Sequence, residues 1–352
     1  MTILYLNITK SIPTKDKVYL GGLEENGVKI IKHLDSAPGV KKFWNIYKYR
    51  RALKTDYDIL WVGYSAHILV PFARLITKKK VIFNTLGSLY EGIITSRHQA
   101  PPFSWKACRI WLIDFLAFNM ASLSLVETNA QIDYTSKTFL APKKKFLRAW
   151  TGVDDKVFFY NPAILKLPRF TVIFRGGLLP DSGVEYFVEA AKLLQNQDIS
   201  FRLLGRGLLV PKIQKILDSF DSHNFEWSQD FLEISELRKK FQECHLSIGW
   251  LCNEPRAMRT IEHKTFESLA MKLPFLHGRT PGIMELLKEN ETGFYCDLND
   301  AKDLAKKILE LKNNPTLLNR VAENGYRLFN QKLRPKYLAN VVLNHLKQQK
   351  II

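Results

Sequence analysis

Cysteine is scarce in this chain of 352 residues, which contains only Cys108, Cys244, Cys252 and Cys296. No two of them stand in a Cys-x-x-Cys pair, so the sequence excludes a zinc ribbon and a disulfide-dense scaffold. The remaining interpretation is a cytoplasmic protein with reduced thiols.

Long apolar runs are also missing. The longest tract, residues 110–126, is interrupted by Asp114 and Asn119, which favours a buried helix followed by a strand over a membrane span. A signal peptide is not expected either, because Lys10 and Lys15 follow a short apolar stretch at the amino terminus.

Acidic residues are too few to balance the charge. The 34 Asp and Glu stand against 52 Lys and Arg, and residues 1–155 alone hold 23 basic and 12 acidic residues, a net charge of +11. Such an excess attracts polyanions. The basic runs 78–80 and 143–145 lack interleaved aromatic residues, so specific nucleic-acid binding is not expected. We expect an anionic membrane surface as the partner, with the protein peripheral on its inner face.

Strand and helix patterns alternate along the chain, which predicts an α/β fold with parallel sheets. The patterns of the first half read as strands at 2–8, 59–63, 81–83, 123–126 and 146–150, and as helices at 24–35, 69–76 and 105–120. Those of the second half read as strands at 170–175, 200–204 and 246–250, and as helices at 184–194 and 210–220.

The alternation pauses between Pro162 and Pro168, which indicates a linker. We therefore expect two Rossmann-like domains, residues 1–159 and 169–330, facing a central cleft. Residues 331–352 form a charged helical tail.

A cationic cluster follows the strand pattern at 246–250. Arg256 and Arg259 are three residues apart, and Lys264 stands just ahead of a helix whose first turn carries Glu267. Because the cluster follows a strand of an open α/β sheet, it is in the place where such sheets bind ligands. The cations suit a pyrophosphate, and a carboxylate can accept both hydroxyls of a ribose. The alternative is an ordinary solvated face, which is what most isolated charge clusters are.

A second feature lies downstream, where Thr280 and Pro281 open another helix. Its amides at Gly282 and Ile283 are predicted to receive a phosphate oxygen. The turn at 205–207 lacks the third glycine of a dinucleotide fingerprint, so a nicotinamide-dependent dehydrogenase is disfavoured.

The order of these features resembles the carboxy-terminal domain of retaining glycosyltransferase family 4, also called glycosyl transferases group 1. The resemblance rests on Lys264 to Pro274, Thr280-Pro281-Gly282, Glu285 and the segment 292–295. It implies the GT-B fold, with an acceptor-side first domain, a nucleotide-sugar-binding second domain and a final helix packed back on the first.

The resemblance also assigns roles in the second domain. Glu267 matches the second of two family glutamates eight positions apart, and Arg259 replaces the first. Arg256, Arg259 and Lys264 resemble a basic variant of this motif. Gly177 and Ser182 replace the family's Arg and Lys, so Arg175 is expected to compensate.

In the first domain, Gly21 and Gly22 resemble the family's glycine turn, at which the backbone approaches the donor phosphate. Asn84 follows a strand at the place where many members carry a His or Asp. Its amide is expected to orient a sugar hydroxyl. His67 and His98 remain weaker candidates, since a lone histidine is more often structural.

No cluster of His, Cys and carboxylates has metal-ligand spacing, and Asp56 and Asp58 read as the polar entry to the strand at 59–63. We expect neither metal nor cofactor. The predicted reaction transfers a hexose from UDP- or GDP-hexose to a glycan or lipid-linked acceptor, in cell-surface polysaccharide or glycolipid biosynthesis. The alternatives are a nucleotide-sugar epimerase of similar architecture and a degenerate, binding-only homologue.

Overall fold

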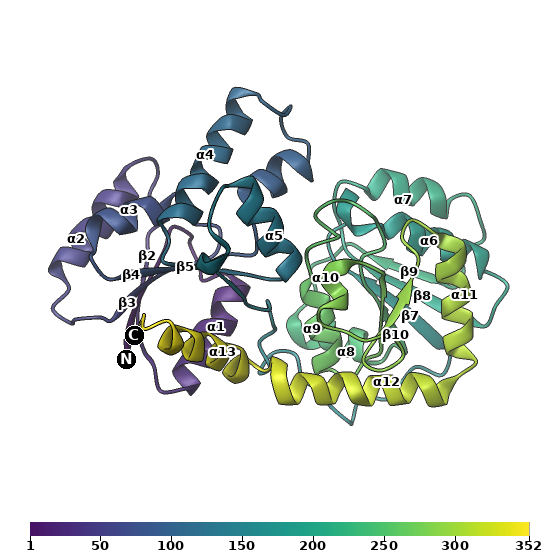
Figure 1. The fold of residues 1–352 in the computed structure, drawn as a ribbon. Helices are drawn as coiled ribbons and strands as arrows, with labels where there is room; N and C mark the ends of the chain where they lie inside the picture. Colours follow the sequence, from purple (N-terminus) through teal and green to yellow (C-terminus); the bar gives the residue numbers. More distant parts are fainter. Residues whose placement is uncertain (352) are drawn as a thin grey trace. The chain divides into compact units, whose positions relative to one another are not determined.

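The computed structural model describes residues 1–351. It consists of two compact α/β units (Figure 1). Unit 1 comprises Met1–Asp154 and Leu333–Ile352, and unit 2 comprises Asp155–Lys332.

Unit 1 is built on a six-stranded parallel sheet in the order β2-β1-β3-β4-β5-β6. The strands are β1 (Thr2–Asn7), β2 (Lys29–Leu34), β3 (Ile59–Val62), β4 (Lys80–Asn84), β5 (Leu123–Val126) and β6 (Phe146–Arg148). The helices are α1 (Thr14–Glu25), α2 (Lys41–Ala52), α3 (Leu69–Ile76), α4 (Trp105–Met120), α5 (Asn129–Thr138) and α13 (Pro335–Gln348), with short turns at Glu91–Thr95 and Lys143–Lys145.

Unit 2 repeats the plan with the parallel order β12-β11-β10-β7-β8-β9. Its strands are β7 (Phe170–Arg175), β8 (Ile199–Leu204), β9 (Phe225–Ser228), β10 (Leu246–Ile248), β11 (Phe275–Gly278) and β12 (Phe294–Cys296). Its helices are α6 (Val184–Leu193), α7 (Val210–Leu217), α8 (Ile234–Gln242), α9 (His263–Ala270), α10 (Pro281–Met284), α11 (Ala301–Lys312) and α12 (Pro315–Leu328), with short turns at Pro180–Ser182 and Phe329–Leu333.

The central strands are buried and largely apolar because helices cover both faces of a parallel sheet. All four residues of β3, including Trp61, are buried, and so are all four of β5. Unit 2 shows the same in β11. Two separate cores result, as the two runs of alternating patterns predict.

The glycine turn predicted at Gly21 and Gly22 is wrong. Both residues lie inside α1, and the segment predicted as helix 24–35 is mostly β2. A side-chain carbon at Gly22 would lie 2.0 Å from the carbonyl oxygen of Pro335 in α13. Gly22 is therefore explained by the close packing of α1 on α13, not by a phosphate.

The segment predicted as a linker is fastened to unit 2. The Gln242 side chain accepts from the Asn161 amide at 2.9 Å. Lys166 donates to the carbonyl oxygens of Gln242 and Cys244 at 2.8 and 2.6 Å. The division between the units falls earlier, after Asp154.

The apolar tract 110–126 divides as its polar interruptions predict, with α4 ending at Met120 and β5 following. Asp58 accepts from the Thr2 amide at 2.7 Å, and Asp56 forms an ion pair with Lys79 at 3.2 Å. Within residues 1–351, no helix combines the length and apolar character that crossing a membrane requires.

Candidate functional site

The strand order of unit 2 reverses between two neighbouring strands. From β7 the chain moves outward through β8 and β9, then returns to place β10 on the other side of β7. In open α/β sheets, ligands usually bind beyond the carboxyl ends of the strands where the order reverses, so the loops after β7 and β10 mark the expected ligand position. Arg175 is the last residue of β7.

Arg175 forms an ion pair with Glu267 at this edge. The guanidinium nitrogen Nη1 lies 2.5 Å from the carboxylate oxygen Oε2, and Glu267 is nearly fully buried. Ninety-two residues separate the pair along the chain. The structure thus brings together two of the predicted donor-binding side chains in one ion pair.

Lys264 lies one turn before Glu267 on α9, in the first turn of the helix rather than ahead of it. The side chain is buried, its Nζ lies 3.4 Å from the centroid of the Phe174 ring, and it has no hydrogen-bond partner. Burial lowers the pKa of Lys264 to about 7; Arg175 acts in the same direction, and Glu262 opposes it. Such an unsatisfied buried cation is ready to accept an anionic ligand.

Glu262, which the sequence analysis missed, directly precedes α9 and connects its start to the loop after β10. Its carboxylate accepts from the Trp250 amide at 2.8 Å and lies 3.1 Å from Nε2 of His277. Burial acts to raise the pKa of Glu262, but the charge and hydrogen bond of His277 bring it below its ordinary value. An acid directly before a helix was the only signal in the sequence.

Arg256 has its charge engaged within the protein. Its Nη1 lies 2.7 Å from Oδ2 of Asp181, a buried carboxylate on the loop after β7, and its guanidinium lies 5.7 Å from the Trp250 ring. This pair ties the basic loop to the β7–α6 connection. To contact a phosphate, Arg256 would have to divide its hydrogen bonds between the phosphate and Asp181, or break its ion pair with Asp181.

The predicted phosphate-binding amides are wrong. The Gly282 amide donates to the carbonyl oxygen of Met258 at 3.0 Å, and the Ile283 amide donates to the Thr280 hydroxyl at 3.3 Å. A side-chain carbon on Gly282 would lie 3.0 Å from the backbone of Arg259. Gly282 is needed because α10 packs on the basic loop, and its amide is already used.

The two other predicted residues of this region are half-buried. Arg259 lies on the loop against α10, and Glu285 directly follows α10. The structure therefore gathers Arg175, Lys264 and Glu267 tightly and places Arg259 on the adjoining loop.

Unit 1 has its own switch point, between β1 and β3. The Asn84 amide donates to Oδ1 of Asp16 at 2.6 Å, and Oδ2 of Asp16 accepts from the Tyr64 amide at 2.8 Å. Asn84 is fully buried. Its amide nitrogen donates to Asp16, and its buried Oδ1 has no hydrogen-bond partner, so the contact with a sugar hydroxyl stays a prediction.

Asp16 belongs to a buried polar group that sequence reasoning missed. Burial raises the pKa of Asp16, although Asn84 opposes this. Lys15 donates to the carbonyl oxygen of Thr85 at 2.7 Å, and burial lowers its pKa to about 8 against the charges of Glu127 and Asp16. This group holds the loops at the carboxyl ends of β1, β3 and β4.

The histidine candidates are structural or exposed. His67 is buried, with Nε2 3.0 Å from the Gly87 carbonyl oxygen, and burial lowers its pKa to about 4. A neutral imidazole held in this way packs the interior. His98 lies on the surface.

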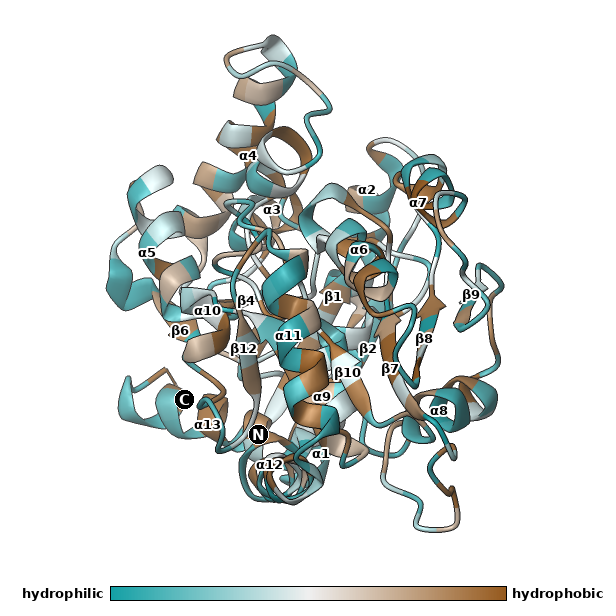
Figure 2. Ribbon diagram, turned by 90° about the vertical axis from the view of Figure 1, so that its right-hand side faces the viewer, coloured by the Kyte–Doolittle hydropathy of each residue, from teal (hydrophilic) through white to brown (hydrophobic). Residues whose placement is uncertain are grey.

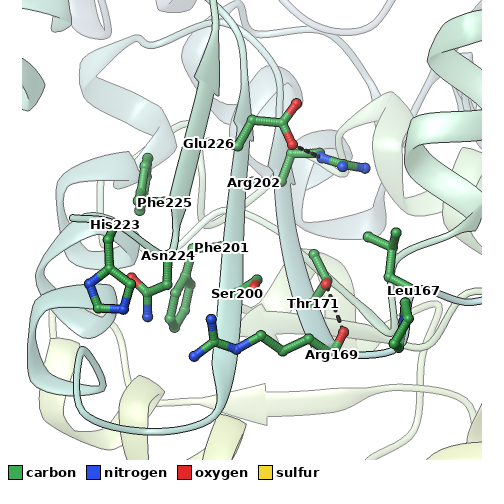
Figure 3. Close-up of a pocket in the computed structure, with 11 residues that line it drawn as sticks. Leu167, Arg169, Thr171, Ser200, Phe201, Arg202, His223, Asn224, Phe225 and Glu226 are labelled. Carbon is green, nitrogen blue, oxygen red and sulfur yellow. Dashed lines mark hydrogen bonds and ion pairs between the residues drawn. The ribbon is translucent and has the colours of Figure 1, made fainter.

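A cavity of about 400 Å³ lies elsewhere in unit 2, near the amino ends of β7, β8 and β9 (Figure 3). Arg202, on its wall, is already paired with Glu226 at 2.6 Å and Glu243 at 2.5 Å. Because this cavity lies at the amino edge of the sheet, it does not match the expected ligand position.

Chemically, the carboxyl edge of unit 2 offers two cations and one carboxylate acceptor. Arg175 can donate in a fixed planar fork, and Lys264 adds an ammonium group that makes no hydrogen bond. Glu267 can accept hydroxyl hydrogens. The set fits a ligand that carries a diphosphate beside a vicinal diol.

Comparisons with known proteins concern the family and the fold. Residues 161–328 match the family model of glycosyl transferases group 1. An uncharacterized glycosyltransferase of Methanocaldococcus jannaschii is 28% identical over 185 residues, 52% of this chain and 48% of that protein. The capsular polysaccharide biosynthesis glycosyltransferase CapM of Staphylococcus aureus is 21% identical over 164 residues, 45% of this chain and 40% of CapM. The matches thus span about half the length of these relatives or less.

The fold is shared over a greater length. HepE of Anabaena, solved in complex with UDP and glucose, superposes with a TM-score of 0.75 at 15% identity, covering 99% of this chain and 100% of HepE. That similarity concerns the architecture, two Rossmann-like domains of the GT-B type. Residues 161–328 of this chain thus match the glycosyl transferases group 1, and the chain as a whole shares the GT-B architecture.

Proposed function

We propose that this protein transfers a hexose from a nucleoside-diphosphate sugar to a glycan or lipid-linked acceptor, with retention of configuration. The observation that carries the proposal is the joint position of Arg175, Lys264 and Glu267 at the switch point of unit 2. The names of the relatives support a place in cell-surface polysaccharide or glycolipid biosynthesis.

The diphosphate and the ribose of the donor assign a role to each residue of the site. The diphosphate lies against Arg175 and Lys264, and Arg259 reaches it from the adjoining loop. Glu267 accepts the two ribose hydroxyls, as a carboxylate can through its two oxygens. The UDP bound in HepE supports a uridine donor for this chain, with GDP-hexose as the alternative.

The reaction places new negative charge on the diphosphate. The bond between the anomeric carbon and the leaving phosphate oxygen breaks, and the acceptor oxygen forms a bond to the same face of that carbon. The acceptor's proton passes to the departing phosphate oxygen. Arg175 and Lys264 stabilise the charge as it develops, so the proposal needs no metal ion.

The acceptor is assigned to unit 1, at the carboxyl edge that Asp16 and Asn84 organise. These two side chains bond to each other and position the surrounding loops. They act as positioning residues, and the acceptor contacts come from the loops that follow β1, β3 and β4.

A panel of nucleotides and nucleotide sugars tests the proposal. UDP, GDP and their hexoses are compared by thermal shift, since a ligand at 100 times its dissociation constant stabilises by about 2.7 kcal/mol. Incubation of the stabilising sugar nucleotide then separates the alternatives. Release of free nucleotide supports transfer or hydrolysis, interconversion of the donor sugar supports an epimerase, and binding without turnover supports a binding-only protein.

A further inference from the structure

The amino end of α4 exposes aromatic side chains that the fold does not cover. Phe103 is 91% exposed and Trp105 is 84% exposed, and Leu112 on the same helix is 50% exposed. Trp105 and Leu112 are seven residues apart, so they share one face of the helix. Burial of either aromatic in unit 1 would have stabilised the fold; both instead face solvent.

The local backbone holds Phe103 outward. Its φ of 65° lies in the left-handed region, which is strained for a bulky residue. Ser104 then caps α4, its hydroxyl accepting from the Ala107 amide at 3.2 Å. Neither packing within unit 1 nor backbone preference explains an aromatic side chain at this position, so we look for a function in contacts with another surface.

The charge around these aromatics has one sign. Arg97, Lys106 and Arg109 are exposed in the segment from Gly92 to Ile113, which contains no acidic residue. The flanking acids, Glu91 and Asp114, are buried. This segment therefore presents three cations and no competing surface carboxylate of its own.

An apolar groove adjoins the exposed end. Its volume is about 320 Å³, and it is lined by Tyr90, Phe103, Ala107, Cys108, Trp111 and Thr138. Figure 1 shows α4 projecting from unit 1, and Figure 2 shows hydrophobic and hydrophilic residues side by side at this projecting end. We name the surface formed by Arg97, Phe103, Trp105, Lys106, Arg109 and Leu112 the α4 tip.

The α4 tip lies toward the carboxyl edge of the sheet. Helix α4 connects the parallel neighbours β4 and β5, so it runs back against the strand direction and begins on the carboxyl side. Asn84 ends β4 on that same side. The tip and the proposed acceptor region thus share one edge of unit 1.

We propose that the α4 tip is an interfacial membrane anchor: Phe103 and Trp105 enter the headgroup region of an anionic bilayer, and Arg97, Lys106 and Arg109 contact lipid phosphates. Amphipathic aromatics and basic side chains are the pairing that such interfaces favour. This inference names the membrane surface for the proposed function but rests on unit 1 alone, and donor binding in unit 2 does not depend on it.

A label at Cys108 reports on the surface directly. Cys108 is exposed at the tip and the other three cysteines are buried, so an environment-sensitive thiol fluorophore marks this one position. With vesicles of phosphatidylglycerol and phosphatidylcholine, the emission should shift to the blue. Vesicles of phosphatidylcholine alone should produce little shift, and salt should reverse it.

Substitutions distinguish vesicle binding through the α4 tip from vesicle binding through the general positive charge of unit 1. Phe103→Ser with Trp105→Ser should lower the partition onto anionic vesicles by about tenfold or more. Leu75→Ser is the matched control, since Leu75 is 79% exposed on α3. Arg109→Glu should weaken binding more than Lys78→Glu, which makes the same charge change on another exposed residue of unit 1.

The outcomes are distinct. Equal binding by the double variant and the parent, or vesicle binding with no change at Cys108, would overturn the proposal in favour of another surface. If the protein bound no vesicle at all, the membrane proposal would also be overturned, and a protein partner would remain as the occupant of the α4 tip. UDP affinity should be the same in the double variant and the parent, so failure here is separable from failure of the donor site.

Discussion

The ammonium nitrogen of Lys264 lies 3.4 Å from the centre of the Phe174 ring and has no hydrogen-bond partner. Phe174 belongs to β7, and Lys264 belongs to α9, 90 residues later. The ring face attracts the cation but leaves its three donors unsatisfied. An anion supplied by a ligand would satisfy them, and the predictions below begin from this point.

Nucleotide affinity should depend on pH through Lys264. Its pKa of about 7 in the free protein should rise when a diphosphate binds, so binding takes up a proton above pH 7. Affinity for UDP should fall by up to about tenfold per pH unit between pH 7 and 9. Calorimetric titration in buffers of different ionisation enthalpy measures both the trend and the proton uptake. Lys264→Met should flatten the profile; an unchanged slope would place Lys264 outside the site.

The same residue should limit stability without ligand. Its pKa of about 7 in the folded state lies below its ordinary value of 10.5, so the folded state binds fewer protons between those values and stability rises with pH there. The destabilisation caused by burying the Lys264 ammonium group is therefore complete below pH 7 and absent above pH 10.5. Lys264→Met should therefore raise the free energy of unfolding by roughly 1–4 kcal/mol at pH 6.5, and by less at pH 10. Denaturant titration at both pH values checks the difference.

The donor-site residues should discriminate between nucleotide and nucleoside. Arg175→Ala, Arg259→Ala and Lys264→Ala should weaken UDP by roughly 1.5–3 kcal/mol each, because each removes a charge-assisted phosphate contact, and should leave uridine nearly unaffected. Glu267→Gln should weaken both ligands because the ribose is common to them. Calorimetric titration with UDP and uridine compares the four variants. If all four bind like the parent, the donor site is elsewhere.

Transfer should not require a divalent metal. Arg175 and Lys264 supply the positive charge that a metal supplies in other enzymes, so activity should survive EDTA. Asp56→Ala should also leave turnover unchanged, because Asp56 pairs with Lys79 at the surface. Loss of activity in EDTA that Mn²⁺ restores would contradict the metal-free reaction.

The neighbouring glycines of α1 should respond oppositely to substitution. Gly22→Ala should destabilise by about 1–3 kcal/mol, because its side-chain carbon would lie 2.0 Å from the Pro335 carbonyl oxygen. Gly21→Ala should stabilise by up to about 1 kcal/mol, since it adds helix propensity at a site with no atom within 4 Å. Thermal unfolding of the two variants compares them. Equal effects would show that α1 does not pack on α13 as described.

Much of the architecture is local and could be predicted. The ranges 69–76, 105–120, 123–126 and 170–175 coincide with α3, α4, β5 and β7, because each carries a strong apolar period bounded by polar residues. The prediction failed around Gly21 and Gly22, where propensity argued for a turn. Tertiary packing against α13 overrides that propensity.

By itself, the sequence determined the fold class, the doubled α/β plan and the basic segment in which the donor site is proposed. These depend on residues close together in the chain, whose period and charge can be read directly. Only the tertiary structure paired Arg175 with Glu267, buried Lys264 over Phe174 and assigned the Gly282 amide to Met258. Strand order decides which distant loops meet. A polar or charged group is available to a ligand only if the fold has not already paired it within the protein.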